Sequence, residues 1–165
     1  VGINASASRR WASKVWPQEQ LIRLCEELGR RDIRVVITGT ADDRHTVELL
    51  KASAPELKLI DSCGRLSVNQ LACLIQRCVV YISGDSAPLH IAAAIGTPSI
   101  ALFGPTDPRR HMPPCAQSAV LYKDVGCNPC YKSKCSRMNC MKAITAEDVL
   151  QAMDALLGAP KGKGV

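Results

Sequence analysis

Two polar turns between apolar runs, within residues 82–108, carry groups suited to binding an anion. The first turn, Gly84-Asp85-Ser86-Ala87, follows the apolar run 79–82 and precedes an alanine-rich segment that we expect to be a helix from about Pro88 to Ile95. The first backbone amides of such a helix lack intrahelical acceptors, and the helix dipole places partial positive charge there. This turn is therefore predicted to hold a phosphate or a carboxylate, with His90 in the first helical turn.

A second turn, Gly104-Pro105-Thr106, follows the apolar run 99–103, which we expect to be a strand. Ligands of open α/β sheets collect at the carboxyl ends of strands, so we include Gly104, Pro105 and Thr106 among the candidate ligand contacts. Ordinary strand-to-helix turns also use glycine, proline and capping residues, so neither turn alone establishes a binding site.

Four of the nine cysteines fall in one short segment, at Cys127, Cys130, Cys135 and Cys140. Their spacing equals that of a zinc knuckle with cysteine in the histidine position, and four thiolates facing one point bind Zn²⁺ tetrahedrally. Two disulfides or an iron–sulfur cluster would use the same sulfurs. We favour a structural Zn²⁺ and expect no metal catalysis. Three other cysteines, Cys25, Cys73 and Cys78, occupy apolar positions and are expected to be small core side chains.

Short apolar runs alternate with segments of helical periodicity, and these elements must position the two turns. We expect strands at about 1–4, 33–37, 57–60, 79–82 and 99–103. Helices are expected at about 17–30 and 43–53, after a capping box at Ser67, and from Thr145 onward. This alternation predicts an α/β fold with a doubly wound, mostly parallel sheet.

Length and composition favour one domain. The chain has 165 residues, 47% of them hydrophobic, and we expect a domain over 1–158 with a cysteine-rich loop, 126–141, before the last helix and a disordered tail at 159–165. It opens in what we interpret as a strand, so we expect a fragment of a longer protein. Its net charge of +6 indicates acidic partners, whereas 4% aromatic residues argue against an extended base-stacking surface.

Residues 85–108 read D-S-A-P-L-H-I-A-A-A-I-G-T-P-S-I-A-L-F-G-P-T-D-P and resemble the donor-site segment of glycosyltransferase family 9, the bacterial heptosyltransferases. Lys14-Val15-Trp16-Pro17 resembles the family's K-x-W-P, and Thr38-Gly39 with Asp42 resembles its nucleotide-side turn. The resemblance runs from residue 1 to about 157 and corresponds to the carboxyl-terminal, donor-binding half of the family. One departure is Ala87, where the family usually has glycine, so a β-carbon stands where a ligand would approach the backbone.

This resemblance implies a Rossmann-like sheet that is one half of a GT-B fold and binds a nucleoside diphosphate sugar. The residues implied to contact the donor are Lys14, Gly39, Thr40, Asp42, Asp85, Ser86, Ala87 and His90. Lys14 would neutralise phosphate charge, the next three residues would lie near the nucleoside, and the last four would hold the diphosphate and sugar.

The implied activity is transfer of heptose or a related sugar, with ADP-heptose as the favoured donor, to a lipopolysaccharide-type acceptor with inversion. In this family the general base belongs to the missing amino-terminal half, which would also bind the glycan acceptor. We therefore expect the fragment to bind its donor without catalysing transfer, and we expect no cofactor for catalysis. The resemblance also implies a cytoplasmic enzyme, with peripheral association at the inner face of the inner membrane as a further option.

Two other functions stay open from the residues. A basic domain with a knuckle-spaced cysteine loop, and Tyr131 beside its second cysteine, also fits a module that binds single-stranded nucleic acid, although the scarcity of aromatic residues leads us to expect no nucleic-acid partner. A sugar-nucleotide epimerase, or another GT-B-like enzyme, would share the same site and differ only in its chemistry.

Overall fold

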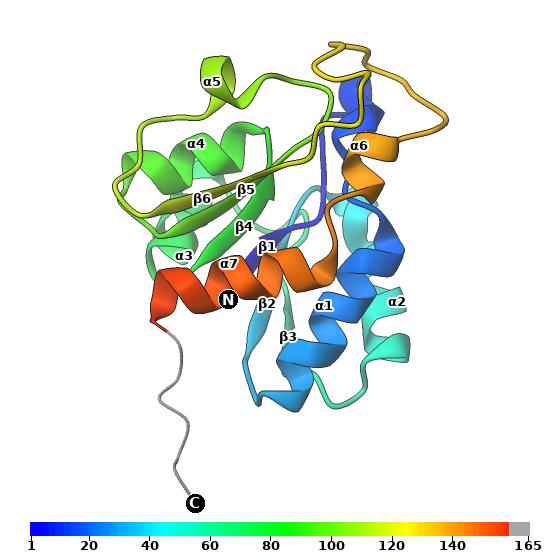
Figure 1. Ribbon diagram of the computed structural model, residues 1–165. Coiled ribbons are helices and arrows are strands. Elements are labelled where there is room, and N and C mark those ends of the chain that lie inside the picture. Colours follow the sequence, from blue (N-terminus) through cyan, green and yellow to red (C-terminus); the bar gives the residue numbers. More distant parts are fainter. Residues whose placement is uncertain (159–165) are drawn as a thin grey trace, which may run out of the picture.

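Six parallel strands form one sheet in the order β3-β2-β1-β4-β5-β6 (Figure 1). The computed structural model describes residues 1–158, so the predicted tail at 159–165 lies outside the described residues. The strands are β1 (Gly2–Asn4), β2 (Val35–Thr38), β3 (Leu59–Asp61), β4 (Tyr81–Gly84), β5 (Ser99–Phe103) and β6 (Ser118–Tyr122). The predicted α/β fold with a doubly wound parallel sheet is confirmed.

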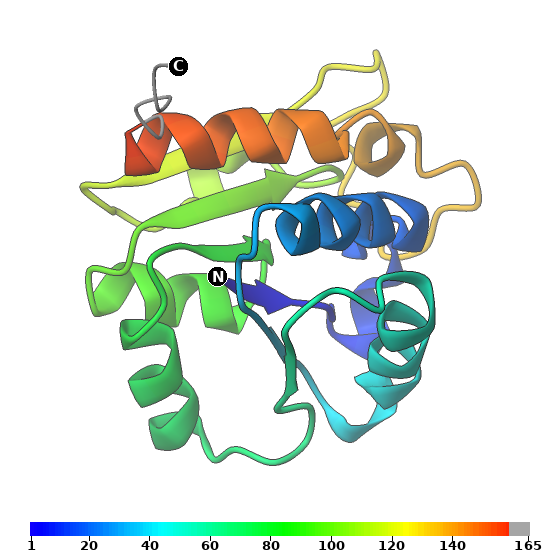
Figure 2. The same ribbon diagram turned by 90° about the horizontal axis from the view of Figure 1, so that it is seen from below.

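Helices cover both faces of the sheet. They are η1 (Arg9–Lys14), α1 (Gln18–Arg30), η2 (Ala41–Asp43), α2 (Arg44–Ser53), α3 (Val68–Gln76), α4 (Ala87–Ala94), α5 (Pro108–His111), α6 (Asn139–Lys142) and α7 (Ala146–Leu157). Helices α1, α2 and α7 lie on one face, and α3 and α4 lie on the other (Figure 2). Within residues 1–158, no helix is both long and apolar enough to cross a bilayer.

The helices form where the sequence supplies an apolar stripe and a cap. Leu21, Leu24 and Leu28 of α1 recur on one face and are buried in the main core cluster, as the periodicity predicts. The predicted capping box at Ser67 is present, because its hydroxyl accepts from the amide of Gln70 and its own amide donates to the Gln70 side chain.

Helix α7 also begins with a capping box. The Thr145 amide donates to the Asp148 carboxylate, and the Asp148 amide donates to the Thr145 hydroxyl. Lys123 adds an ion pair to Asp148 at 2.7 Å. Burial opposes ionisation of Asp148, but the hydrogen bonds from Lys123 and Thr145 outweigh it and lower the pKa of this carboxyl.

Some elements differ from the sequence-based expectation. Strand β6, the 3₁₀ helix η1 and the short helices α5 and α6 were not predicted. Strand β4 begins at Tyr81, two residues later than expected, and Val79 is 58% exposed at its amino-terminal side. The expectation that Cys73 and Cys78 belong to the core is wrong for Cys73, which is exposed, and only partly right for Cys78, which is half-buried. Cys73 lies on α3, whose deepest residue is Ile75, whereas Cys78 follows the helix and packs against the small cluster of Ile75, Tyr81 and Ala92.

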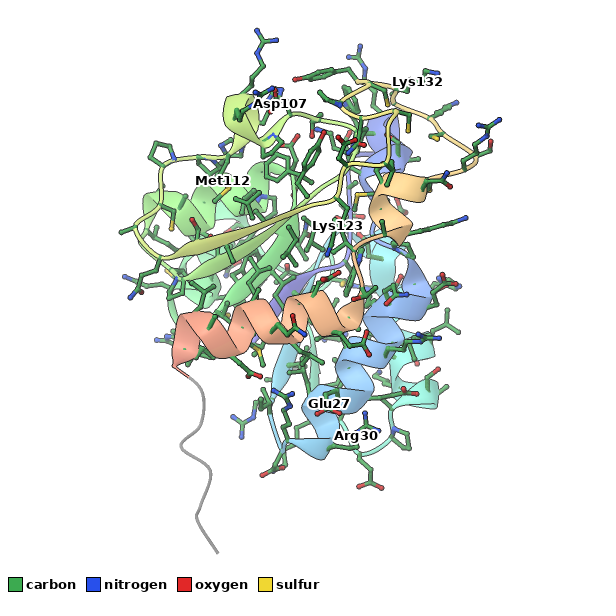
Figure 3. The ribbon with its side chains drawn as sticks, viewed as in Figure 1. Glu27, Arg30, Asp107, Met112, Lys123 and Lys132 are labelled. Carbon is green, nitrogen blue, oxygen red and sulfur yellow. The ribbon has the colours of Figure 1, made fainter. Side chains whose placement is uncertain are left out.

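The order in which strands are added to the sheet reverses between β1 and β4. From β1 the chain continues outward through β2 and β3, and from β4 it continues the other way through β5 and β6. Because the two halves leave this point toward opposite edges, a crevice opens beyond the carboxyl ends of β1 and β4. Both predicted polar turns lie at this edge, and so does Asp107, whereas the Glu27–Arg30 ion pair of α1 lies at the opposite end (Figure 3).

Candidate functional site

A cavity of about 330 Å³ lies beyond the carboxyl ends of the central strands. Residues that follow four of the strands contribute to its wall. The polar and glycine residues that these strand ends supply are Asn4 at the end of β1 with Ser6 and Ser8 after it, Thr38 at the end of β2 with Gly39 and Thr40 after it, Ser62 after β3, and Asp85 and Ser86 after β4. Trp11 and Lys14 of η1 close one side, and Leu66 and Leu71 add an apolar part. A crevice with a mostly apolar surface and a few polar and charged groups at the strand ends is suited to a ligand that combines charged and flat apolar groups.

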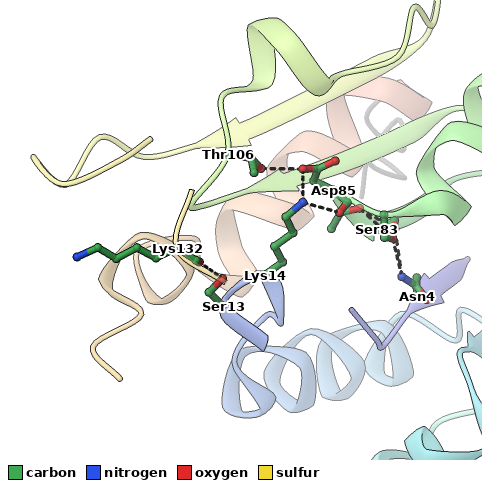
Figure 4. A network of polar contacts seen from close by, with 9 residues as sticks. Asn4, Ser13, Lys14, Ser83, Asp85, Thr106 and Lys132 are labelled. Carbon is green, nitrogen blue, oxygen red and sulfur yellow. Dashed lines mark hydrogen bonds and ion pairs between the residues drawn. The ribbon is translucent and has the colours of Figure 1, made fainter. Parts of the chain in front are cut away.

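An ion pair between Lys14 and Asp85 is the main charged feature of this cavity (Figure 4). The Lys14 ammonium lies 2.6 Å from Asp85 Oδ2, and the two side chains are 14% and 8% exposed. The same ammonium lies 4.4 Å from the centroid of the Trp11 ring, a cation–π distance. Thr106 donates its hydroxyl proton to Asp85 Oδ2 at 2.8 Å. An ammonium carries three N–H donors, so its contact with Asp85 is compatible with binding a ligand phosphate as well.

A second polar network fixes the turn before α4. Asn4 donates from Nδ2 to Ser86 Oγ at 3.1 Å and to Ser83 Oγ at 3.3 Å, and the two serine hydroxyls are 3.1 Å apart. Ser86 is the N-cap residue of α4, yet its side chain makes no capping bond, because it joins this network instead. The carboxyl end of β1 therefore holds the start of α4 in place.

The amino terminus of α4 offers fewer free donors than the sequence suggested. Pro88 has no N–H, and the Leu89 amide already donates to the Ser86 carbonyl at 3.0 Å. The dipole of this eight-residue helix and the amides of Ser86 and Ala87 remain as its contribution to an anion site. Ala87 is exposed and lines the cavity, so the departure from the motif adds a β-carbon to the cavity wall.

The turn after β2 is shaped by a capping box. Thr40 donates to Asp43 Oδ2 from its amide at 2.6 Å and from its hydroxyl at 2.8 Å. A β-carbon at Gly39 would lie 2.7 Å from that same oxygen, so this position requires glycine for the close approach. Asp42 is exposed on η2, beside this turn and outside the set of residues that line the cavity.

Most of the predicted donor residues come together. Those that line the cavity are Lys14, Gly39, Thr40, Asp85, Ser86 and Ala87. Thr106 contacts Asp85, whereas His90 is exposed on α4 and, like Asp42, lies outside the lining set. Gly104 and Pro105 also lie outside it, and the donor-binding roles of all the predicted residues, inside and outside the lining, stay predictions. Sequence reasoning missed Asn4 and Ser83, although both are polar residues at the carboxyl ends of expected or observed apolar strands.

The four clustered cysteines surround a separate cavity of about 560 Å³. Cys140 is buried, Cys127 is exposed and the other two are half-buried, and all four are free thiols. Within residues 1–158, no group of three or more potential ligands lies close enough to hold a metal ion. The expected convergence of four sulfurs on one point is therefore not seen, although the loop does bring all four to one hollow.

The thiol groups of this loop differ in acidity. Hydrogen bonds from the backbone amides of Met138 and Arg137 lower the pKa of Cys135, which favours its thiolate. Burial raises the pKa of Cys140, and the nearby Cys127 and Cys130 add to that effect. Cys135 is thus the thiol of this loop that is best prepared to act as a ligand or nucleophile.

The sequence model of glycosyltransferase family 9 (heptosyltransferase) matches residues 1–141. The chain belongs to glycosyltransferase family 9. This confirms the resemblance found in the sequence, and it does not support the nucleic-acid-binding module or the epimerase.

Family 9 relatives align with most of the chain. It is 33% identical over 115 residues to a lipooligosaccharide heptosyltransferase 2 of Haemophilus influenzae, covering 67% of this chain and 33% of that protein. A lipooligosaccharide heptosyltransferase 2 of Campylobacter jejuni is 26% identical, with coverage of 95% and 50%. The solved ADP-heptose lipopolysaccharide heptosyltransferase II of Escherichia coli matches with a TM-score of 0.80 at 26% identity, over 94% of this chain and 45% of that one. The chain spans about a third to a half of the length of these relatives.

Proposed function

We propose that this chain is the donor-binding part of a bacterial heptosyltransferase, which transfers heptose or a related sugar from a nucleoside diphosphate to a lipopolysaccharide-type acceptor. Membership of family 9 and the heptosyltransferase relatives support the reaction class. The relative of known structure is described as an ADP-heptose enzyme, which supports ADP-heptose as the donor. The observation that carries the proposal is the Lys14–Asp85 pair in a crevice at the point where the strand order of the sheet reverses.

The donor would lie across this crevice. Lys14 and the start of α4 supply positive potential for the diphosphate, and the turn at Gly39 and Thr40 borders the nucleoside. Leu66 and Leu71 provide an apolar wall for one face of the base. In this proposal Asp42 accepts from ribose hydroxyls and His90 approaches the diphosphate from α4.

The transfer is a displacement with inversion at the anomeric carbon. The acceptor oxygen forms the new glycosidic bond as the bond to the nucleoside diphosphate breaks, and the acceptor proton passes to a general base. The leaving diphosphate gains negative charge, which Lys14 stabilises electrostatically. We assign the base and the acceptor site to the part of the relatives that this chain does not span, and we place the whole enzyme in the cytoplasm.

Nucleotide binding is the decisive experiment. Isothermal titration calorimetry should detect binding of ADP in preference to GDP and UDP, and ADP at 100 times its Kd should stabilise the fold by about 2.7 kcal/mol. Lys14→Met should abolish this stabilisation. The matched control is Lys123→Met. Like Lys14, Lys123 forms an ion pair with an aspartate, Asp148, but it lies outside the cavity lining. Binding of a single-stranded oligonucleotide with steep salt dependence, and no binding of ADP, would contradict the proposal.

We also propose a structural Zn²⁺ at Cys127, Cys130, Cys135 and Cys140. Two features support it: the four thiols line one cavity, and the lowered pKa of Cys135 favours a thiolate ligand. Binding of the ion would require the four sulfurs to move closer together, because within residues 1–158 no three potential ligands lie close enough to hold a metal. Elemental analysis of protein purified under reducing conditions should give one zinc per chain. Loss of four titratable thiols without metal would show two disulfides instead.

A further inference from the structure

The cysteine-rich loop contacts the chain immediately beside Lys14. Ser13 is 2% exposed, and its hydroxyl donates to the main-chain carbonyl of Lys132 at 2.6 Å (Figure 4). The Ser13 amide donates to the Ser133 carbonyl at 3.2 Å. Two bonds from one buried serine therefore tie η1, which carries Lys14, to the loop.

The same loop contacts the chain beside Thr106. The Pro105 carbonyl accepts from the amides of Cys130 at 3.0 Å and Tyr131 at 2.9 Å. The next residue, Thr106, is 1% exposed and donates to Asp85 Oδ2. At the base of the loop, Gly104 packs so tightly on Met141 that a β-carbon would lie 2.4 Å from its sulfur.

Residues 130–133 thus bind both flanks of the ion pair through main-chain hydrogen bonds. Ser13 precedes Lys14 in the sequence, and Lys14 supplies the ammonium of the pair. Pro105 precedes Thr106, whose hydroxyl donates to the carboxylate of the pair. Ser13 and Pro105 also line the thiol cavity, so both anchors lie beside the four cysteines.

We propose that the cysteine-rich loop positions the Lys14–Asp85 pair for the donor diphosphate, with Ser13 and Thr106 as the positioning residues. This inference rests on the proposed function. Thr106 aims one carboxylate oxygen at Lys14, and Ser13 sets the height of η1 above the crevice. The loop is therefore part of the donor site, although its residues 126–141 lie outside the lining of that cavity.

The two positioning residues predict a specific pattern of ADP affinities. Thr106→Val keeps the shape of the side chain and removes the hydroxyl, and Ser13→Ala removes the hydroxyl bond to the loop. Each should weaken ADP binding about fivefold to tenfold, the scale of one hydrogen bond. Thr106→Ser restores the hydroxyl and should bind ADP within about twofold of the parent, which a loss of packing alone would not allow.

The matched control is Lys132→Gln, because the side chain of Lys132 is exposed and only its main-chain carbonyl takes part in the contact. This variant should bind ADP like the parent. Calorimetric titration of the five proteins with ADP, with urea unfolding to verify that each is folded, tests the pattern. If the parent binds no ADP, the proposed function fails and this inference fails with it. If the parent binds ADP and folded Thr106→Val and Ser13→Ala bind it equally well, the inference alone is wrong.

Discussion

Replacement of Lys14 by methionine should destabilise the fold before any ligand is added. The substitution keeps most of the side-chain volume and removes the cation that contacts the Asp85 carboxylate. Removing one partner of a buried ion pair typically costs about 3–5 kcal/mol, because the other charge stays desolvated. Since Lys14 borders a cavity and is 14% exposed, we expect the lower end, about 3 kcal/mol. For a domain of this size this corresponds to a decrease in Tm of roughly 6–12 °C.

A double-mutant cycle separates the charge effect from the change in shape. Asp85→Asn keeps an oxygen for the Thr106 hydroxyl and leaves Lys14 beside the cavity, so it should cost about 1 kcal/mol. The double variant, Lys14→Met with Asp85→Asn, leaves no unpaired buried charge at this pair. Its free energy of unfolding should therefore be only about 1–2 kcal/mol below that of the parent. The coupling free energy between the two positions should then be about 2–3 kcal/mol.

Urea unfolding followed by far-ultraviolet circular dichroism measures all four free energies. The m-value should stay constant across the cycle, since the surface exposed on unfolding hardly changes. A Lys14→Met variant within about 0.5 kcal/mol of the parent would refute the reasoning, because it would mean that water already screens the pair. Additive single effects would refute it as well.

Three further substitutions or reactions test other contacts. Gly104→Ala should cost about 1–3 kcal/mol in urea unfolding through overpacking against Met141, and a neutral result would mean that the loop base shifts freely. Cys135 should react with iodoacetamide faster than the exposed Cys73 at pH 7, as peptide mass mapping would show, and its advantage should shrink above the ordinary thiol pKa of about 8.5. Asp148→Ala should lower the free energy of unfolding by about 1 kcal/mol at pH 7. Because the pKa of Asp148 is lowered in the folded state, this difference should persist above about pH 4 and disappear as the pH falls through the lowered pKa. A difference that does not change with pH would contradict this prediction.

The sheet and most of its helices could be predicted because their residues carry strong local signals. Strand β5 has the predicted bounds, and its five residues are all buried, with a continuous apolar run after Ser99. Strand β6 escaped prediction because it lies at the edge of the sheet, where its residues are only partly buried and alternate weakly. The start of β4 was predicted two residues too early, because Val79 is apolar and adjoins the strand although its side chain is exposed.

The candidate site was only partly predictable, because its partners are distant in sequence. The motif identified Lys14 and Asp85 separately, but their contact, and the part played by Thr106, depend on how three loops meet. The structure gives Trp16 of the K-x-W-P motif a structural role that the motif alone did not indicate. Its indole N–H donates to the Ile144 carbonyl at 2.9 Å, so this residue ties the start of α1 to the segment before α7 and serves the fold.

The narrow pairing between β1 and β4 has a consequence for the kinetics of folding. Gly2 pairs with Tyr81 and Ile3 with Ile82, and this short seam joins the half-sheet β1-β2-β3 to the half-sheet β4-β5-β6. Its partners are far apart in sequence, so closing it carries a large loop entropy and we expect it to form late in the folding reaction. Asn4 on one side and Ser86 on the other already meet above the seam. A ligand that bridges these two residues would stabilise a contact that forms after the transition state for folding. It would therefore slow unfolding more than it speeds folding.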